Sequence, residues 1–155
     1  MSVADWSRWM HASVAAYLKN VADGIQLPSL VEGVEDRTKA FMKATDRAEI
    51  RVNGPYTKKF SGMHEARIYV NVLVTSNMGQ DKNAFSYDTI LGAFHAAMDV
   101  EIPLFKTGSS ADDQTQIGCL KQIDEVKVFR FGQLSSDDRV RQGMVTSAYT
   151  YHFER

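Results

Sequence analysis

The sequence predicts an α+β fold with a single domain over residues 1–155, in which an antiparallel sheet carries two amphipathic helices packed on one face. Two segments repeat their apolar residues at helical spacing, and other segments alternate apolar and polar residues with the period of a strand. Several strand-like segments follow one another without a helix between them, which favours antiparallel pairing. The length of 155 residues, with 44% hydrophobic and 24% charged residues, is typical of one globular domain.

The first helix is expected from about Val3 to Val21. Its apolar stripe consists of Trp6, Trp9, Met10, Val14, Tyr17, Leu18 and Val21. Ser2 is suited to cap its start, and Asp23-Gly24 is a stop signal. Two tryptophans so close together predict that this helix is a large hydrophobic anchor.

The next twenty residues are less regular. Pro28 interrupts the apolar run from Ile25 to Val31, so this segment is expected to form at most a short edge strand. From Glu32 to Thr45 the pattern leaves both a helix and a strand open, with helical propensity from Arg37 to Lys43.

A hairpin is expected after residue 45. Residues from Ala48 to Val52 alternate as a strand does, and Asn53-Gly54-Pro55 predicts the turn. Tyr56 to Phe60 would then begin the returning arm, with a bulge or bend at Ser61-Gly62.

The clearest strand pattern runs from about Ala66 to Thr75. One side consists of Ile68, Val70, Val72 and Val74, which predicts a dry face against the core. The other side is mixed and consists of Arg67, Tyr69, Asn71 and Leu73. We expect this mixed side to be a subunit interface, and the alternative is an ordinary solvated sheet face.

A second helix is expected from about Ala84 to Asp99, with an apolar line through Tyr87, Leu91, Phe94 and Met98. A short extended piece at Ile102 to Phe105 and a polar loop at Gly108 to Gln116 follow this helix. The remaining segments have strand patterns: Ile117 to Ile123, Val126 to Phe131 and Val140 to Phe153. The last strand is long enough to cross the domain or reach past it, which makes it a second candidate for assembly.

Composition argues against several classes of protein. The formal net charge is −1 without a basic stripe, unlike a dedicated nucleic-acid binder. Cys119 is the only cysteine, so no intramolecular disulfide can form, and its strand pattern predicts a buried structural thiol. A signal peptide and a membrane-length apolar run are not apparent, so the expected compartment is the cytoplasm or an assembly built there.

Catalytic and metal-binding patterns are also not found in the sequence. His95 and Asp99 share a helix face, but a helix-terminal His near an acid explains them more simply than a metal site. Asp112 and Asp113 lie in a polar loop that offers nothing to separate their pKa values, so they are expected to be a solvated acidic tip. GxSxG, Walker A, GxGxxG and HExxH motifs are missing. We therefore expect no enzyme activity, cofactor or metal.

An ordered series of segments carries a resemblance to a known family. These segments are Glu49 to Pro55, Tyr69 to Thr75, the helix with Gly92 and Met98 leading into Ile102-Pro103, the Asp-rich loop, Ile117 to Leu120, Phe131 to Gln133 and the strand through Gln142 to Tyr151. In this order they resemble the tail terminator proteins, which are neck proteins of long-tailed bacteriophages. The family is held together by fold more than by invariant residues, and it has no catalytic residues.

The resemblance implies a structural virion protein that forms a ring, usually a hexamer. Such a ring caps the tail tube, ends its polymerisation and offers the joint to the head-completion, or stopper, proteins. DNA passes through the lumen without specific binding, and the ring belongs to the tail and neck of a virion assembled in the host cytoplasm. Asp112 and Asp113 are then candidates for a loop that faces the lumen or a neighbouring subunit.

Two alternatives remain open. One is another head–tail connector or a tail tube subunit. The other is a small cone-shaped α+β ligand-binding protein or enzyme, in which a curved sheet encloses a pocket. The aliphatic strand faces around Ala48 to Val52 and Ile68 to Val74 favour a filled core over such a pocket.

Overall fold

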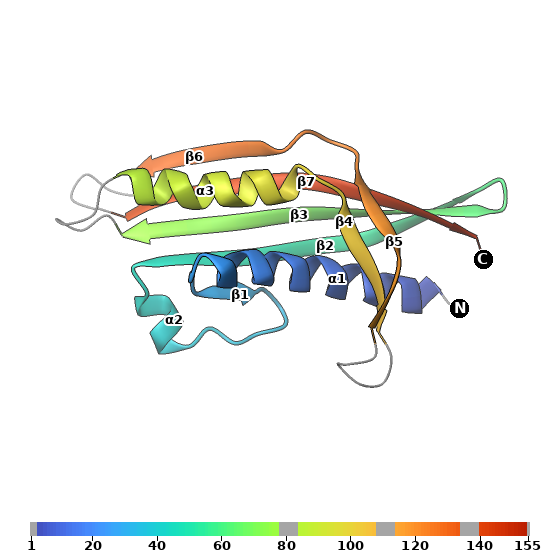
Figure 1. Ribbon diagram of the computed structural model, residues 1–155, viewed down its shortest axis with the longest axis horizontal. Coiled ribbons are helices and arrows are strands. Elements are labelled where there is room, and N and C mark those ends of the chain that lie inside the picture. The colour runs from blue at the N-terminus through green and yellow to red at the C-terminus, as the bar shows by residue number, and fades with distance from the viewer. Residues whose placement is uncertain (1–2, 78–83, 108–113, 134–139, 155) are drawn as a thin grey trace.

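The computed structural model describes residues 3–77, 84–107, 114–133 and 140–154 (Figure 1). In chain order the elements are α1 (Val3–Gly24), β1 (Ser29–Val31), α2 (Lys39–Lys43), β2 (Asp46–Phe60), β3 (Met63–Asn77), α3 (Ala84–Met98), β4 (Ile102–Thr107), β5 (Gln114–Gln122), β6 (Lys127–Gln133) and β7 (Val140–Glu154). The predicted long helices and the strands after residue 100 are confirmed within a few residues. The α+β class is confirmed as well.

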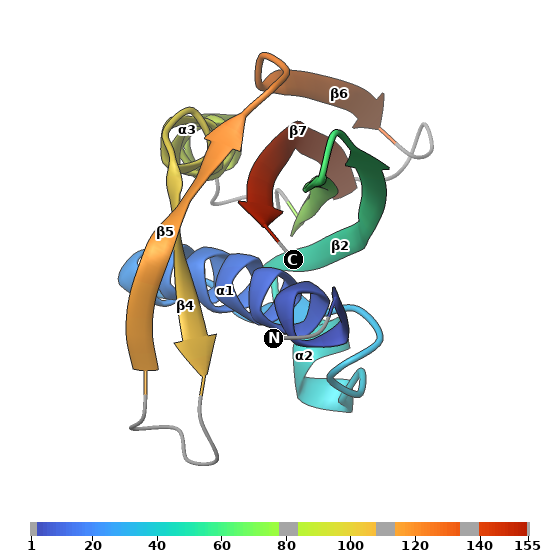
Figure 2. The same cartoon turned by 90° about the vertical axis from the view of Figure 1, so that its right-hand side faces the viewer.

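The strands form one curled sheet. Its order is β1-β2-β3-β7-β5-β4, and β6 pairs with β7 beside β5. Among the described strands, β1 runs parallel to β2, whereas the other pairs are antiparallel. Figure 2, which looks almost along β2, β3 and β7, shows these strands wrapped around one another rather than lying flat. The predicted antiparallel sheet is therefore confirmed, with a short parallel edge strand added at Ser29–Val31.

A hydrophobic cluster fills the space between the helices and the sheet. From α1 it takes Trp6, Trp9, Met10, Val14, Leu18 and Ala22, and from α3 it takes Tyr87, Ile90, Leu91, Phe94 and Met98. The strand side includes Ile68, Val70, Val72 and Val74, all fully buried. The predicted dry face of β3 is confirmed, because period-two alternation against a core fixes which side chains point inward.

The predicted turn of the hairpin is wrong. The ladder between β2 and β3 continues past Asn53-Gly54-Pro55 as far as the pair Phe60 and Met63, and the chain reverses at Ser61-Gly62. The register shifts between Asn53 and Tyr56, where Gly54 has φ +101° and a Cβ would lie 2.9 Å from the Arg67 carbonyl oxygen. The Gly-Pro pair therefore forms a bulge inside the strand.

The real turn also has a local cause. Ser61 and Gly62 have φ values of +47° and +79°, and a two-residue hairpin of type I′ needs left-handed conformations at both central positions. The undecided segment before β2 contains the one-turn helix α2. Thr38 caps it, since its Oγ1 accepts a hydrogen bond from the Phe41 N–H at 3.1 Å, and the Phe41 side chain is buried.

Most of the long C-terminal strand is paired on both sides. β7 pairs with β3 from Val140 to Glu154, and its other side is shared by β6 and β5. Both sides of its backbone are paired at Arg141–Thr146 and Tyr149–Thr150, so most of β7 is an inner strand. From Tyr151 to Glu154, β3 is its one strand partner among the described residues. In the part of the chain that the structure describes, no helix is both long and apolar enough to cross a membrane.

Candidate assembly surface

One face of β2, β3, β7 and β6 carries exposed aromatic side chains; we call it the Tyr69 face. It consists of Tyr56, Arg67, Tyr69, Asn71, Leu73, Phe129, Met144 and Thr146. The strand register brings these residues together. Arg67 on β3 lies opposite Tyr56 on β2. At the other end of the face, Met144 on β7 lies between Leu73 on β3 and Phe129 on β6. The four residues predicted to share the mixed side of β3 do lie on this one face; their role as a subunit contact stays a prediction.

The aromatic side chains of this face are unusually open. Tyr56, Tyr69 and Phe129 are 62%, 40% and 44% exposed, and Phe131, further along β6, is 51% exposed. The rings of Tyr56 and Tyr69 lie 5.9 Å apart between centroids. Scattered exposed apolar residues are normal, but a contiguous group on one face indicates an interaction surface.

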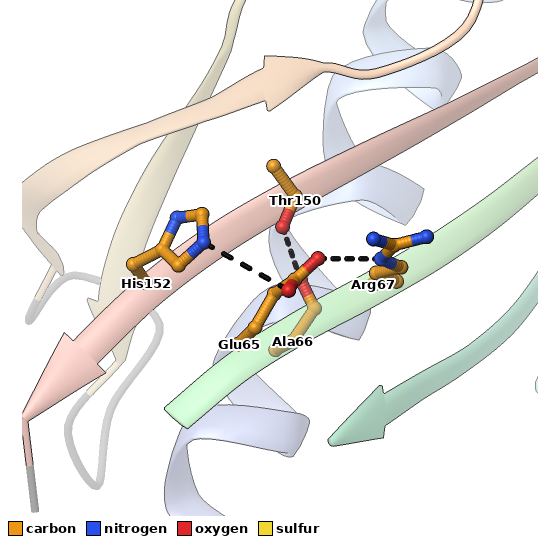
Figure 3. A network of polar contacts seen from close by, with 5 residues as sticks. All are labelled: Glu65, Ala66, Arg67, Thr150 and His152. Carbon is orange, nitrogen blue, oxygen red and sulfur yellow. Dashed lines mark hydrogen bonds and ion pairs between the residues drawn. The ribbon is translucent and has the colours of Figure 1, made fainter. Parts of the chain in front are cut away.

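Arg67 is held in place by its neighbours on the sheet (Figure 3). Its Nε donates a hydrogen bond to the Glu65 carboxylate, which also lies 4.0 Å from the His152 imidazole on β7. The hydrogen bond from Arg67 lowers the pKa of the Glu65 carboxyl below its ordinary value. Beside them, the Thr150 hydroxyl donates to the Ala66 carbonyl oxygen at 3.1 Å. Glu65 therefore orients the guanidinium of Arg67 on this face, while the Arg67 side chain stays 51% exposed.

A shallow pocket of about 230 Å³ opens on this face. It is lined by Tyr69, Asn71, Asp124, Glu125, Lys127, Thr146, Ser147 and Ala148. The main-chain oxygen of Asp124 accepts hydrogen bonds from Gln122 Nε2 at 2.7 Å and from the Ser147 hydroxyl at 3.3 Å. These bonds fix the connection between β5 and β6, so that the carboxylates of Asp124 and Glu125 form an exposed acidic rim.

Two sheet edges are closed by the chain itself. On β4, Pro103 has no N–H to offer, and the Ser13 hydroxyl of α1 accepts the Phe105 N–H at 3.0 Å. The opposite edge is the three-residue strand β1. Short or blunted edges discourage strand addition, so these two edges are poor places for a neighbouring chain to pair.

The other sequence candidates do not assemble into a site. His95 is exposed on α3, and the described residues contain no group of three or more His, Cys, Asp or Glu side chains that could hold a metal. Cys119 is half-buried in β5 rather than fully buried, because β5 lies near the end of the sheet. Asp112 and Asp113 lie outside the described residues.

A second groove, of about 340 Å³, lies between α1 and β4. Its lining is Ala12, Ser13, Ala16, Tyr17, Asn20, Pro103 and Phe105. The Tyr17 hydroxyl is its one ionisable group, and this hydroxyl donates to the Ala97 carbonyl oxygen at 2.6 Å. The groove therefore offers small and apolar surface, without an acid–base pair for catalysis.

Sequence reasoning missed the contribution of β2 and β6 to the Tyr69 face. The alternation of Phe129 and Phe131 with Val128 and Arg130 was a usable signal for one aromatic side of β6. It could not show that this side continues the face of Tyr69, because that depends on β6 pairing with β7.

No protein-family model matches the sequence, and no curated protein sequence matches it either. Among solved structures, one chain is similar to this protein, with 13% identity and a TM-score of 0.62. The alignment covers 96% of this chain and 96% of the other. At this identity the likeness shows that the fold is shared and no more.

Proposed function

We propose that this protein is the structural subunit of a tail terminator ring in a long-tailed bacteriophage. The ring caps the finished tail tube, ends its polymerisation and forms the joint to the head-completion proteins of the neck. The observation that supports this proposal most is the Tyr69 face, where three strands expose aromatic side chains next to an oriented arginine. Aromatic residues and arginine are the residues that most often dominate binding energy in protein interfaces.

In this proposal α1 and α3 both cover the face of the sheet opposite the Tyr69 face. Three contacts support this arrangement. Both helices contribute to the hydrophobic cluster that buries Ile68 and Val72. The Tyr17 hydroxyl of α1 donates a hydrogen bond to the Ala97 carbonyl of α3, and the Tyr149 hydroxyl of β7 donates one to the carbonyl at the end of α3. A sheet covered by helices on one side keeps its other side for neighbouring subunits.

A ring requires a contact between two different patches, repeated around an axis until it closes. The edges at β1 and β4 are poor sites for pairing of strands between subunits, whereas β6 pairs with β7 alone among the described strands and keeps an outer edge. A net charge of −1 suits a conduit through which DNA passes without being held.

In this proposal the loop with Asp112 and Asp113 faces the lumen or a neighbouring subunit. Normal assembly and infectivity of a phage with Asp112→Asn and Asp113→Asn would contradict this placement of the loop.

The mass of the native particle in solution tests the proposal. Native mass spectrometry is expected to give six times the chain mass of 17.4 kDa, and negative-stain electron microscopy is expected to show closed rings. Open tubes under the same conditions would instead favour a tube subunit. A protein that stays monomeric even when mixed with uncapped tail tubes would contradict both the terminator and the tube-subunit roles. It would instead favour the ligand-binding alternative.

A further inference from the structure

The hairpin between β2 and β3 forms a basic arm; we use this name for residues 56–66. Its tip lies at one end of the long axis, past both chain termini (Figure 1). Lys58 and Lys59 are exposed on this arm. Tyr56 and Lys58 are two residues apart on a strand, so their side chains project from the same side of the sheet. The arm therefore presents an exposed aromatic ring together with an ammonium group.

The acidic rim has the opposite charge and lies elsewhere on the molecule. Asp124 and Glu125 belong to the connection between β5 and β6, which Figure 1 shows near the middle of the long axis, well away from the arm tip. Between the residues that the structure describes, no ion pair involves Asp124, Glu125 or Lys59. Lys58 lies opposite Glu65 on β3 and helps to lower the pKa of its carboxyl, after the larger effect of Arg67. The rim borders a pocket whose lining also includes Tyr69, Lys127 and Ala148.

We infer that the basic arm of one copy binds the pocket beside Tyr69 of a second copy, with Lys58 facing Asp124 and Glu125. Lys59, on the opposite side of the strand, adds to the positive charge of the arm. This inference deepens the proposed ring and rests on it. Within one copy, Tyr56 at the base of the arm already contacts Tyr69, and the rest of the hairpin stays paired up to Phe60 and Met63 and extends away from the connection between β5 and β6. Since the arm and the pocket are different surfaces, the contact is heterologous, which is the kind that closes into a ring.

Charge complementarity selects a second copy over a nucleic acid as the occupant of the pocket. The two carboxylates of the rim outnumber the ammonium group of Lys127, which also lines the pocket, so phosphates would be repelled. An ammonium group and a tyrosine ring match the acids and the apolar part of the lining. A single exposed ion pair contributes little. The contact therefore depends on Lys58 and Tyr56 together with the added charge of Lys59, and we expect it to weaken as salt screens the charges.

Charge reversal on each side separates this contact from other ways of forming a ring. The arm variant is Lys58→Glu/Lys59→Glu, and the rim variant is Asp124→Lys/Glu125→Lys. Each variant alone places like charges opposite each other, so the protein concentration needed for half-assembly is expected to rise by roughly tenfold or more. The readout is mass photometry, with thermal unfolding to show that each variant is folded.

An equimolar mixture of the two variants gives the decisive result. The reversed arm of one variant then meets the reversed rim of the other, and the remaining native arm meets the remaining native rim. Alternating rings are therefore expected to form again. The matched control is Lys39→Glu/Lys43→Glu, which makes the same change of charge on exposed residues of α2 and should assemble as the native protein does.

The outcomes distinguish this contact from the ring itself. Single variants that assemble as well as the native protein, or a mixture that stays unassembled, would overturn the contact and leave the ring intact. A native protein that remains monomeric at low salt, both alone and with uncapped tail tubes, would overturn the ring and the contact together.

Discussion

The hydroxyl of Tyr149 on β7 donates a hydrogen bond to the main-chain oxygen of Met98 at the end of α3. Tyr149 is fully buried, so this bond joins the middle of the sheet to the helix that packs on it. It also satisfies one of the carbonyl groups that the last turn of a helix leaves without a partner.

Replacing Tyr149 with phenylalanine is expected to lower the free energy of unfolding by about 1–3 kcal/mol, because the buried Met98 carbonyl loses its donor. Chemical denaturation of the purified protein measures this change. Tyr151→Phe is the matched control, since the Tyr151 hydroxyl makes a longer bond of 3.3 Å to Ile117 and its residue is only half-buried. An equal loss in both variants would contradict the structural role given to Tyr149.

The same tyrosine predicts how stability depends on alkaline pH. Burial raises the pKa of Tyr149 from 10.0 to about 12. Its contribution is complete below pH 10, and it is lost as the pH rises towards 12 because the unfolded chain releases this proton first. The slope from this residue is at most about 1.4 kcal/mol per pH unit.

Denaturation series from pH 9 to pH 12 measure this slope. Tyr149→Phe should reduce it without abolishing it, because burial also raises the pKa of Tyr17 and of Tyr87. A slope that is unchanged in this variant would exclude Tyr149 as a source of the pH dependence.

Gly143 on β7 is required by the close approach of α3. A Cβ at this position would lie 2.4 Å from the Tyr87 hydroxyl oxygen and 3.0 Å from the Phe129 carbonyl oxygen. Gly143→Ala is therefore expected to cost about 1–3 kcal/mol of stability through overpacking, measured by thermal or chemical unfolding.

A double variant tests which contact is responsible. The Tyr87 hydroxyl is buried without a hydrogen-bond partner among the described residues, so Tyr87→Phe alone is expected to be neutral or stabilising by about 1 kcal/mol. In Gly143→Ala/Tyr87→Phe the shortest contact is gone, and part of the lost stability should return. Strict additivity of the two changes would show that the Tyr87 hydroxyl does not cause the clash.

Ser13 protects the edge of the sheet at β4. Ser13→Ala removes the acceptor of the Phe105 N–H, which is expected to cost about 1 kcal/mol and to leave a free donor on an edge strand. Light scattering during heating should show earlier aggregation than in Ser7→Ala, a change on α1 away from β4. The protection of this edge would be refuted by identical aggregation of the two variants.

The Tyr69 face is expected to matter for assembly and not for folding. Phe129→Ser should change the unfolding temperature little, since the side chain is already 44% exposed, but it should reduce ring formation in native mass spectrometry. Met42→Ser is the matched control, because Met42 on α2 is 47% exposed and lies off this face. Equal assembly of both variants would remove Phe129 from the proposed interface.

The sequence by itself determined the elements and their inner sides. Trp6 to Val21 and Tyr87 to Met98 have the period of a helix, and Ile68 to Val74 have the period of a strand, so burial followed from local pattern. The Tyr69 side of β3 could be predicted for the same reason. These properties depend on residues within one segment.

Only the tertiary structure decided where the hairpin turns and which strands share a face. Asn53-Gly54-Pro55 has strong turn propensity, yet the ladder to β3 continues through it, because pairing over many residues outweighs one local preference. Phe129 joins the face of Tyr69 only because β6 pairs with β7. Such pairings connect segments far apart in the chain, and period-two alternation indicates a side of a strand but never its neighbour.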